Sequence, residues 1–213
     1  MDLKMTDIEK ETELYKSHPE ELYTKSFFCK MQRIRPWQNA VGKIIVDNFK
    51  INSAIDFGCG LGYYLEGMQQ AGCKNLVGLE YMYEYAVLYL SDNIKSNIFK
   101  QDIMESVSLG KFDLSMSIEV AEHLLPEKSD IFIDNLVNSS NKYIFFTAAP
   151  KGQGGTGHIN ERPKEFWIEK LNARGFNFSE EDTKLLKLNI SKINFKSKYF
   201  NLMKHQFMLF RKK

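Results

Sequence analysis

The segment from Ile51 to Gly72 constrains the fold more than any other part of the sequence, because it joins a strand to a helix through a glycine-rich turn. A short apolar run, Ile51–Ile55, is followed by Asp56 and then by glycines at positions 58, 60 and 62. Residues 63–71 then read as a helix that Gly72 ends. Glycine lets a backbone approach a ligand closely, and a helix N-terminus offers free N–H groups. The segment therefore predicts a ligand-binding turn in an α/β sheet.

The glycine spacing indicates which kind of ligand the turn binds. Dinucleotide-binding turns have G-x-G-x-x-G, whereas this turn has G-x-G-x-G with Tyr63 at the place of the last glycine. Asp56, two residues before the first glycine, suits a ligand with a cationic amino-acid end. The segment resembles the first motif, D-x-G-x-G-x-G, of class I S-adenosylmethionine-dependent methyltransferases. The alternative, an ordinary glycine-rich turn between strand and helix, remains open on this motif alone.

Two further acids follow the next predicted strands. Residues 75–80 read as a strand ending in Glu80, 24 residues after Asp56, and residues 96–103 as a third strand with Asp102 near its end. An acid at the first of these places can accept hydrogen bonds from ribose hydroxyls. The resemblance implies S-adenosyl-L-methionine as cofactor and Asp102 near its adenine. It implies the following cofactor-binding residues: Asp56, Gly58, Cys59, Gly60, Gly62, Glu80, Tyr81, Asp102, Ile103 and Ile118.

The length of 213 residues predicts a single α/β domain. We expect a doubly wound, Rossmann-like, seven-stranded and mostly parallel sheet, with a helical cap over residues 1–50, a cofactor-binding core over 51–150 and an acceptor-side region over 151–213. Residues 5–50 read as two helical pieces, the second from Trp37 to Phe49. The remaining expected elements are strands 112–118 and 142–147, a helix capped by Ser129 and running to about 139, a glycine-rich loop 150–160, a helix from Pro163 to Gly175, a capping box 179–182 and a last strand 206–210. The resemblance implies that this last strand is antiparallel and closes the sheet.

Cysteine usage and charge bear on compartment and partners. Cys29, Cys59 and Cys73 have no metal-ligand spacing, and we find neither a signal-peptide pattern nor a membrane-spanning run, so we expect a cytoplasmic protein with reduced thiols and no membrane partner. From Thr183 onward there are nine basic residues and no acid: Lys184, Lys187, Lys192, Lys196, Lys198, Lys204, Arg211, Lys212 and Lys213. Because they are dispersed, a solvated surface is favoured over a phosphate-binding one, although a nucleic-acid partner is not excluded.

The chemistry is expected after the fourth and fifth strands. If Glu119 opens a helical turn, Glu122 and His123 fall three and four residues later on the same face. Two carboxylates and an imidazole can act as general bases or hold a divalent cation such as Mg²⁺. The motif Glu-x-x-Glu-His resembles that of ubiquinone-biosynthesis O-methyltransferases and small-RNA 2′-O-methyltransferases. The resemblance implies a metal that binds neighbouring hydroxyls of the acceptor. His158, 35 residues after His123, is a further candidate, although the later histidine of the small-RNA enzymes lies much farther along the chain.

These residues define the predicted function. His123, His158 and Glu122 are the candidate catalytic residues, and Glu119, Glu122, His123 and His158 the candidate metal ligands. The Asn/Asp-Pro-Pro-aromatic run of many base-modifying amino methyltransferases is absent after the fourth strand. We therefore expect O-methylation of a small polyhydroxylated acceptor, such as a sugar or nucleotide-sugar. The alternatives are an RNA-terminal 2′-O-methyltransferase, which lacks support from any appended RNA-binding module, and a non-catalytic partner subunit of this fold.

Overall fold

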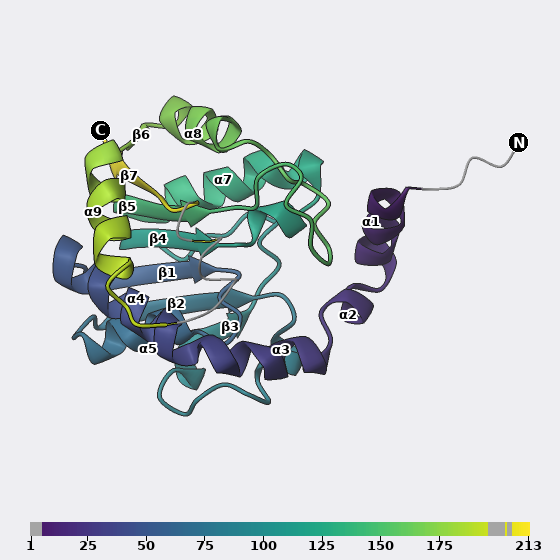
Figure 1. The fold of residues 1–213 in the computed structure, drawn as a ribbon, viewed down its shortest axis with the longest axis horizontal. Helices are drawn as coiled ribbons and strands as arrows, with labels where there is room; N and C mark the ends of the chain where they lie inside the picture. The colour runs from purple at the N-terminus through teal and green to yellow at the C-terminus, as the bar shows by residue number, and fades with distance from the viewer. Residues whose placement is uncertain (1–5, 196–202, 204–205) are drawn as a thin grey trace, which may run out of the picture.

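A seven-stranded sheet forms the centre of the molecule in the computed structural model, which describes residues 6–195, 203 and 206–213 (Figure 1). The strand order is β3-β2-β1-β4-β5-β7-β6. Strands β1 to β5 pair in parallel, and β7 runs antiparallel to both of its neighbours. The predicted doubly wound, mostly parallel sheet is confirmed. The strands are β1 (Ser53–Phe57), β2 (Asn75–Glu80), β3 (Ile98–Lys100), β4 (Phe112–Ile118), β5 (Ser140–Thr147), β6 (Phe176–Phe178) and β7 (Met208–Lys212).

The observed strand limits agree best with the predicted ones where turn-forming or acidic residues stand at both ends of an apolar run. β2 and β4 have the predicted limits, whereas β1 begins and ends two residues later than expected. The expected third strand over 96–103 was too long, because residues 95–97 form a 3₁₀ turn, η2 (Lys95–Asn97), and only Ile98–Lys100 pair with β2. Asp102 therefore follows β3 in a loop.

The last strand does not close the sheet as expected. β7 lies between two strands, with Tyr143 of β5 opposite Arg211 and Phe176 of β6 opposite Lys212. The edge is instead formed by β6, a three-residue strand that the sequence pattern did not reveal. The expected antiparallel direction of β7 is confirmed, but its place at the sheet edge was wrong.

Two layers of helices cover the sheet. Helices α4 (Arg35–Phe49), α5 (Tyr63–Gln70) and α9 (Glu180–Ile190) share one core cluster, and α7 (Ser129–Asn138) and α8 (Lys164–Ala173) share the other. Side chains alternate across β5 accordingly: Phe145 belongs to the first cluster, while Ile144 and Phe146 belong to the second. This alternation is the period of a strand buried on both faces.

The contact between α4 and α5 depends on two glycines. A Cβ atom on Gly42 would lie 2.1 Å from the carbonyl oxygen of Tyr64, and one on Gly67 would lie 2.1 Å from that of Asn39. Backbone atoms cannot yield at such distances, so the two helices meet with no side chain between them at these points. The close approach fixes the start of α5, and hence the glycine turn that precedes it.

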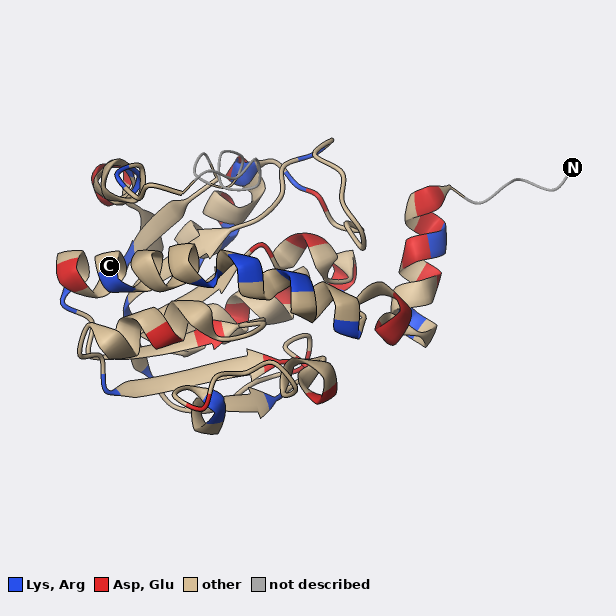
Figure 2. Cartoon of the chain, turned by 60° about the horizontal axis from the view of Figure 1, so that its bottom comes forward, with Lys and Arg blue, Asp and Glu red and all other residues tan. Residues whose placement is uncertain are grey.

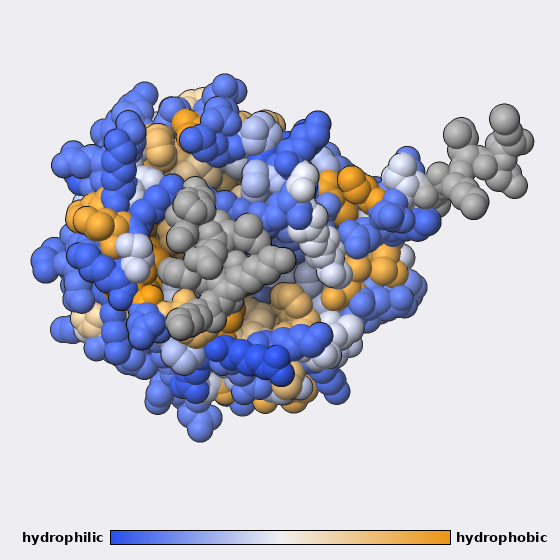
Figure 3. All heavy atoms as spheres, viewed as in Figure 1, coloured by the Kyte–Doolittle hydropathy of each residue, from blue (hydrophilic) through white to orange (hydrophobic). Residues whose placement is uncertain are grey.

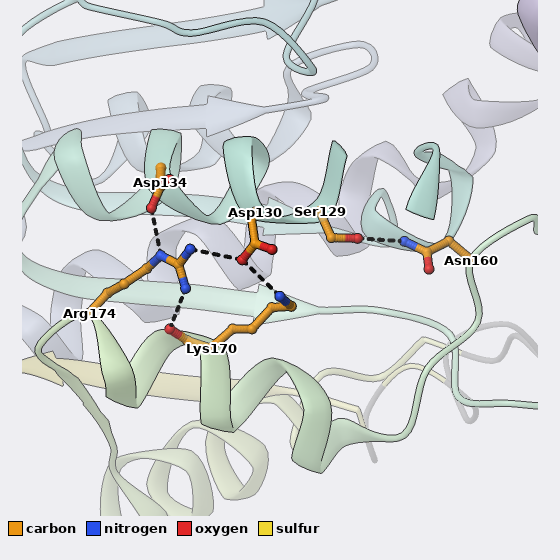
Figure 4. Close-up of polar contacts among 6 residues, drawn as sticks. All are labelled: Ser129, Asp130, Asp134, Asn160, Lys170 and Arg174. Carbon is orange, nitrogen blue, oxygen red and sulfur yellow. Dashed lines mark hydrogen bonds and ion pairs between the residues drawn. The ribbon is translucent and has the colours of Figure 1, made fainter. Parts of the chain in front are cut away.

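Helices α7 and α8 are joined by ion pairs on their exposed side (Figure 4). Lys170 and Arg174 of α8 both reach Asp130, at 2.8 Å in each case, and Arg174 also bonds Asp134. Ser129 begins α7 but does not cap it as expected: Lys128 is the N-cap residue, and the Ser129 hydroxyl instead accepts a hydrogen bond from Asn160 at 3.0 Å. That bond ties α7 to the loop after β5.

The N-terminal residues form more helices than the two expected pieces. They are α1 (Asp7–Ser17), α2 (Pro19–Leu22), α3 (Lys25–Met31) and the 3₁₀ turn η1 (Gln32–Ile34), before α4 begins. A capping box of Thr6 and Glu9 opens α1. In Figure 1 α1 to α3 lie on the side to which the parallel strands point, so they stand over the strands' C-terminal ends. The other short elements are α6 (Tyr83–Ala86), η3 (Ala121–His123) and η4 (Pro126–Lys128).

The surface carries both charges, with hydrophobic residues near the N-terminal helices. Asp and Glu predominate on α1, and Lys and Arg are spread over many elements (Figure 2). Three basic residues of the C-terminal series, Lys196, Lys198 and Lys204, lie outside the described residues. Hydrophobic atoms show near α1 and α2 in Figure 3. Within the described ranges, none of the helices has the length and apolar character needed to cross a membrane, and the three cysteines are free.

Candidate functional site

A cavity of about 630 Å³ lies at the C-terminal ends of the parallel strands. The glycine turn after β1 and the residues that follow β2, β3 and β4 form its inner wall, and α1 to α3 contribute Tyr15, Tyr23, Phe27 and Phe28. A cleft at this edge of an open α/β sheet is the usual place for a ligand. The sequence did not single out these aromatic residues, because their role depends on how the cap folds over the sheet.

The turn after β1 has the backbone that its glycines predict. Gly58, Gly60 and Gly62 have φ of 77°, 55° and 65°, the left-handed region that favours glycine. A Cβ on Gly58 would lie 2.6 Å from Val120, and one on Gly60 would lie 2.6 Å from Met31 of the cap. Gly58 and Gly60 line the cavity, whereas Gly62 is the N-cap residue of α5 and is not among the lining residues.

The three predicted acids Asp56, Glu80 and Asp102 all line this cavity. The Glu80 carboxylate accepts hydrogen bonds from the backbone N–H of Gly60 (2.9 Å) and of Met82 (2.8 Å), and each of its oxygens keeps a second lone pair. Burial, and secondarily the charge of Glu80, raises the pKa of Asp56 to about 8. A cationic ligand beside these two buried carboxyl groups would stabilise their charged forms. Of the other implied residues, four also line the cavity: Cys59, Tyr81, Ile103 and Ile118.

Glu119 does not open a helical turn as expected. It directly follows β4 with a left-handed φ of 54°, and the helical geometry starts only at Ala121, in the 3₁₀ turn η3. Its carboxylate accepts a hydrogen bond from the Thr147 hydroxyl at 2.7 Å, and burial raises its pKa to about 7. Non-glycine residues in this conformation cost energy and occur preferentially at functional sites.

Three of the four predicted ligands come together without Glu119. Glu122, His123 and His158 each place one potential ligand atom within 4.8 Å of the others. We call these three residues the acid–histidine centre. The rings of His123 and His158 meet edge to face with centroids 4.8 Å apart. The loop after β5 therefore brings His158 to the turn after β4, as the sequence interpretation required.

Electrostatics set Glu122 apart within the acid–histidine centre. It is fully buried, and neither carboxylate oxygen meets a hydrogen-bond donor among the described residues. Burial, followed by the charge of Glu119, raises its pKa well above the ordinary value. A buried polar group without a partner costs about 1–3 kcal/mol, so a ligand that satisfies it would stabilise the site.

Both imidazoles are oriented by their Nδ1 atoms. His123 Nδ1 lies 3.1 Å from the carbonyl oxygen of Gly157, and His158 Nδ1 lies 2.8 Å from the Glu161 carboxylate. Donation from Nδ1 leaves Nε2 with its lone pair, the arrangement usual for histidines that bind metals. Burial, and then the nearby His158, lowers the pKa of His123 to about 4, so its imidazole is neutral at pH 7. One carboxylate and two imidazoles fit a divalent cation of the Zn²⁺, Mn²⁺ or Fe²⁺ type.

Asn160 holds the two halves of the acid–histidine centre together. Its backbone N–H donates to the carbonyl oxygen of Glu122 at 2.9 Å, and its side-chain amide donates to the oxygens of Ala121 (3.3 Å) and Ser129 (3.0 Å). In Figure 4 its amide points to Ser129 from the loop after β5. A buried asparagine between glycine-rich sequence and Glu161 carries no motif, so this role was not predictable.

Comparison with known proteins gives a fold but no sequence family. No protein-family profile and no curated protein matches the chain. Magnesium protoporphyrin IX methyltransferase from Synechocystis PCC 6803, crystallised with S-adenosylmethionine, superposes with a TM-score of 0.58 at 17% identity, over 99% of this chain and 98% of the other. Human N-acetylserotonin methyltransferase gives 0.59 at 15% identity, over 94% and 58%. The methyltransferase domain of bacterial Hen1 gives 0.53 at 17% identity, over 82% and 98%.

These superpositions cover between 82% and 99% of this chain. The chain therefore has the fold of the class I S-adenosylmethionine-dependent methyltransferases. At identities below 20% the likeness concerns the fold, and the site has to be argued from the chain's own residues.

Proposed function

We propose that this protein is an S-adenosylmethionine-dependent methyltransferase. The observation that carries the proposal is the convergence of Asp56, Glu80 and Asp102 on one cavity beside the glycine turn. The cofactor is cationic at its sulfonium and ammonium groups, and a cation beside the buried Asp56 and Glu80 would oppose the effect of burial, which raises the pKa of Asp56 to about 8. Its ribose hydroxyls can donate to the remaining lone pairs of Glu80.

Cofactor binding tests this proposal directly. Glu80→Ala should weaken the binding of S-adenosylhomocysteine by about 1.5–3 kcal/mol, the usual contribution of a charge-assisted hydrogen bond. Isothermal titration calorimetry of both proteins measures the difference. Glu84→Ala is the matched control, because the Glu84 side chain is 60% exposed and pairs with Lys100 on the surface. Absence of binding to the wild type, or equal affinity for Glu80→Ala, would count decisively against the assignment.

We further propose that the reaction is O-methylation of a small hydroxylated acceptor at the acid–histidine centre. Methyl transfer is an in-line displacement, in which the acceptor oxygen bonds to the methyl carbon as the C–S bond breaks and S-adenosylhomocysteine leaves. The hydroxyl proton must pass to a base, because a neutral hydroxyl is a poor nucleophile. The Glu122 carboxylate, whose pKa is raised, the neutral imidazole of His123 and the imidazole of His158 are the candidate proton acceptors.

A divalent cation fits the same three side chains. Glu122, His123 and His158 would hold it, and when bound it would supply a Lewis acid that lowers the pKa of an acceptor hydroxyl. Glu119, bonded to Thr147, is not part of this set and remains free to contact the acceptor from the cavity wall. Vicinal hydroxyls, as in a sugar or nucleotide-sugar, would suit such a centre.

Treatment with a chelator distinguishes a cation-dependent mechanism from one in which a histidine acts as a metal-free base. With a cation, EDTA should abolish methyl transfer to a panel of hydroxylated acceptors, and added Mg²⁺ or Mn²⁺ should restore it. With His158 as a metal-free base, EDTA has no effect, while His158→Ala lowers turnover by roughly 10²–10⁴-fold. If His123→Ala and His158→Ala both retained full activity, the chemistry would have to take place elsewhere in the protein.

An RNA acceptor is the second candidate, motivated by the Glu-x-x-Glu-His motif and the basic C-terminal series. Lys184, Lys187 and Lys192 lie on or just after α9, whereas the acid–histidine centre lies at the strands' C-terminal ends. Salt dependence of binding distinguishes the two acceptors. A steep fall in RNA affinity with added salt, from submicromolar binding at low salt, would favour RNA, because counterions are released from phosphates.

A further inference from the structure

A residue of the N-terminal cap brings a buried polar atom without a partner to the wall of the cavity. The hydroxyl oxygen of Tyr23, between α2 and α3, is buried and has no hydrogen-bond partner among the described residues. Both oxygens of Glu122 are in the same condition, and the two residues line one cavity. Buried hydroxyls of tyrosine are almost always paired, so orphans facing a shared cavity indicate a missing ligand.

The position of Tyr23 relates it to the acid–histidine centre. Its ring packs edge to face on the ring of His123, with centroids 5.6 Å apart. A Cβ atom on Gly157 would lie 2.7 Å from the Tyr23 hydroxyl and 3.4 Å from His123 Nδ1, so these two polar atoms flank the same glycine. Glycine at position 157 thus keeps open the space beside the hydroxyl.

The cap is attached to the loop that carries His158. The backbone N–H of Gly157 donates to the Glu11 carboxylate of α1 at 3.0 Å, and Tyr15 of α1 packs edge to face on Tyr23. The phenol O–H can act as a hydrogen-bond donor, and Tyr23 lines the same cavity as Glu80 and Glu122.

We propose that Tyr23 belongs to the acid–histidine centre and donates a hydrogen bond to the oxygen held there, whether that oxygen is from water or from the acceptor. The proton stays on Tyr23 throughout, and the hydroxyl serves to orient the oxygen toward the cofactor. The inference rests on the proposed function. It adds that the N-terminal cap, besides covering the site, supplies a hydrogen-bond donor inside it through Tyr23.

Binding of Mn²⁺ tests the inference without a known acceptor. Mn²⁺ is titrated into protein saturated with S-adenosylhomocysteine, and free ion is measured by electron paramagnetic resonance. A residue that orients an oxygen on a bound ion typically contributes 10–100-fold to affinity, so Tyr23→Phe should weaken Mn²⁺ binding by about 10-fold. The phenylalanine ring keeps the packing on His123, and an unchanged melting temperature and S-adenosylhomocysteine affinity would verify that the fold is intact.

Tyr143→Phe is the matched control. Tyr143 lies on β5 beside Arg211, outside the cavity, and its loss of a hydroxyl should leave Mn²⁺ affinity unchanged. Equal Mn²⁺ affinity of Tyr23→Phe and the wild type overturns the inference and leaves the proposed centre intact. A wild type that binds no Mn²⁺ overturns both the inference and the cation, while its S-adenosylhomocysteine binding still reports separately on the cofactor site.

Discussion

The buried carboxylate of Glu66, behind the glycine turn, offers a sharp test of how the cofactor side is held in place. It is fully buried in α5 and accepts four close hydrogen bonds: from Arg35 Nε (2.9 Å) and Nη2 (2.5 Å), from Asn39 (3.1 Å) and from Ser91 (2.8 Å). These donors come from α4 and from the segment after α6. Glu66 therefore joins three segments around the start of α5.

Glu66→Gln keeps the volume but removes the charge and turns one acceptor oxygen into a donor that faces other donors. A single hydrogen bond to a charged group contributes about 1.5–3 kcal/mol, and breaking a buried ion pair costs about 3–5 kcal/mol. Because the Arg35 side chain is 42% exposed and can be rehydrated, we expect the lower part of this range. The free energy of unfolding in urea should fall by about 2–4 kcal/mol.

The difference in free energy of unfolding between the wild type and Glu66→Gln should also become smaller as the pH falls. Burial alone would raise the pKa of Glu66, but the hydrogen bonds from Arg35, Ser91 and Asn39 lower it below the ordinary value. A lowered folded-state pKa stabilises the protein above the unfolded-state pKa of about 4.3, and this stabilisation is lost as the pH falls through the folded-state value. The gap between wild type and Glu66→Gln should therefore narrow in acid.

Glu105→Gln is the control for this experiment. Its carboxylate, 63% exposed, pairs with Lys128 at 2.9 Å, and exposed pairs of this kind contribute about 0–1 kcal/mol. The reasoning would be refuted if Glu66→Gln and Glu105→Gln shifted the unfolding curve equally. It would also be refuted if Glu66→Gln lowered the free energy of unfolding by the same amount at pH 3 and at pH 7.

Two further substitutions test packing and the loop after β5. Gly67→Ala should destabilise the protein by about 1–3 kcal/mol in urea unfolding, because its Cβ would meet the Asn39 carbonyl, although helix propensity alone predicts a gain of about 1 kcal/mol. Stabilisation would disprove the close helix contact. Asn160→Ala should lower the free energy of unfolding by about 1–3 kcal/mol, since Ser129 and Ala121 lose their donor, and calorimetry should find unchanged S-adenosylhomocysteine affinity.

The sheet was predictable where sequence patterns are local and long enough. The runs 75–80 and 112–118 have turns or acids on both sides, and their limits in the structure are those expected. β6 has only three residues, and its pairing with β7 joins residues 32 to 36 positions apart in the sequence, so no local pattern marks it. Ser129 has the residue type of a helix cap, but its hydroxyl is used by Asn160 instead.

In the candidate site, too, residues within local sequence patterns could be predicted, whereas residues placed by tertiary folding could not. Asp56, Glu80 and Asp102 could be found because each follows a strand, and parallel strands bring their ends to one edge. Glu122 and His123 could be found from their motif, yet the helical turn expected at Glu119 was wrong, because a left-handed residue intervenes. Tyr23, by contrast, reaches the site through the folding of three short helices, which spacing in the sequence cannot reveal.

The place of β7 inside the sheet has a consequence for biosynthesis. β5 ends at Thr147, but its outer edge stays unpaired until the ribosome has added the chain as far as Lys212. Until then β6 has no neighbour, and the hydrogen-bonding groups of Tyr143 to Phe146 face solvent beside apolar side chains, the kind of edge that associates with other chains. The nascent protein therefore has an aggregation-prone, unpaired strand edge while more than sixty further residues, from Thr147 to Lys212, are synthesised. Chaperones would protect this edge during that time.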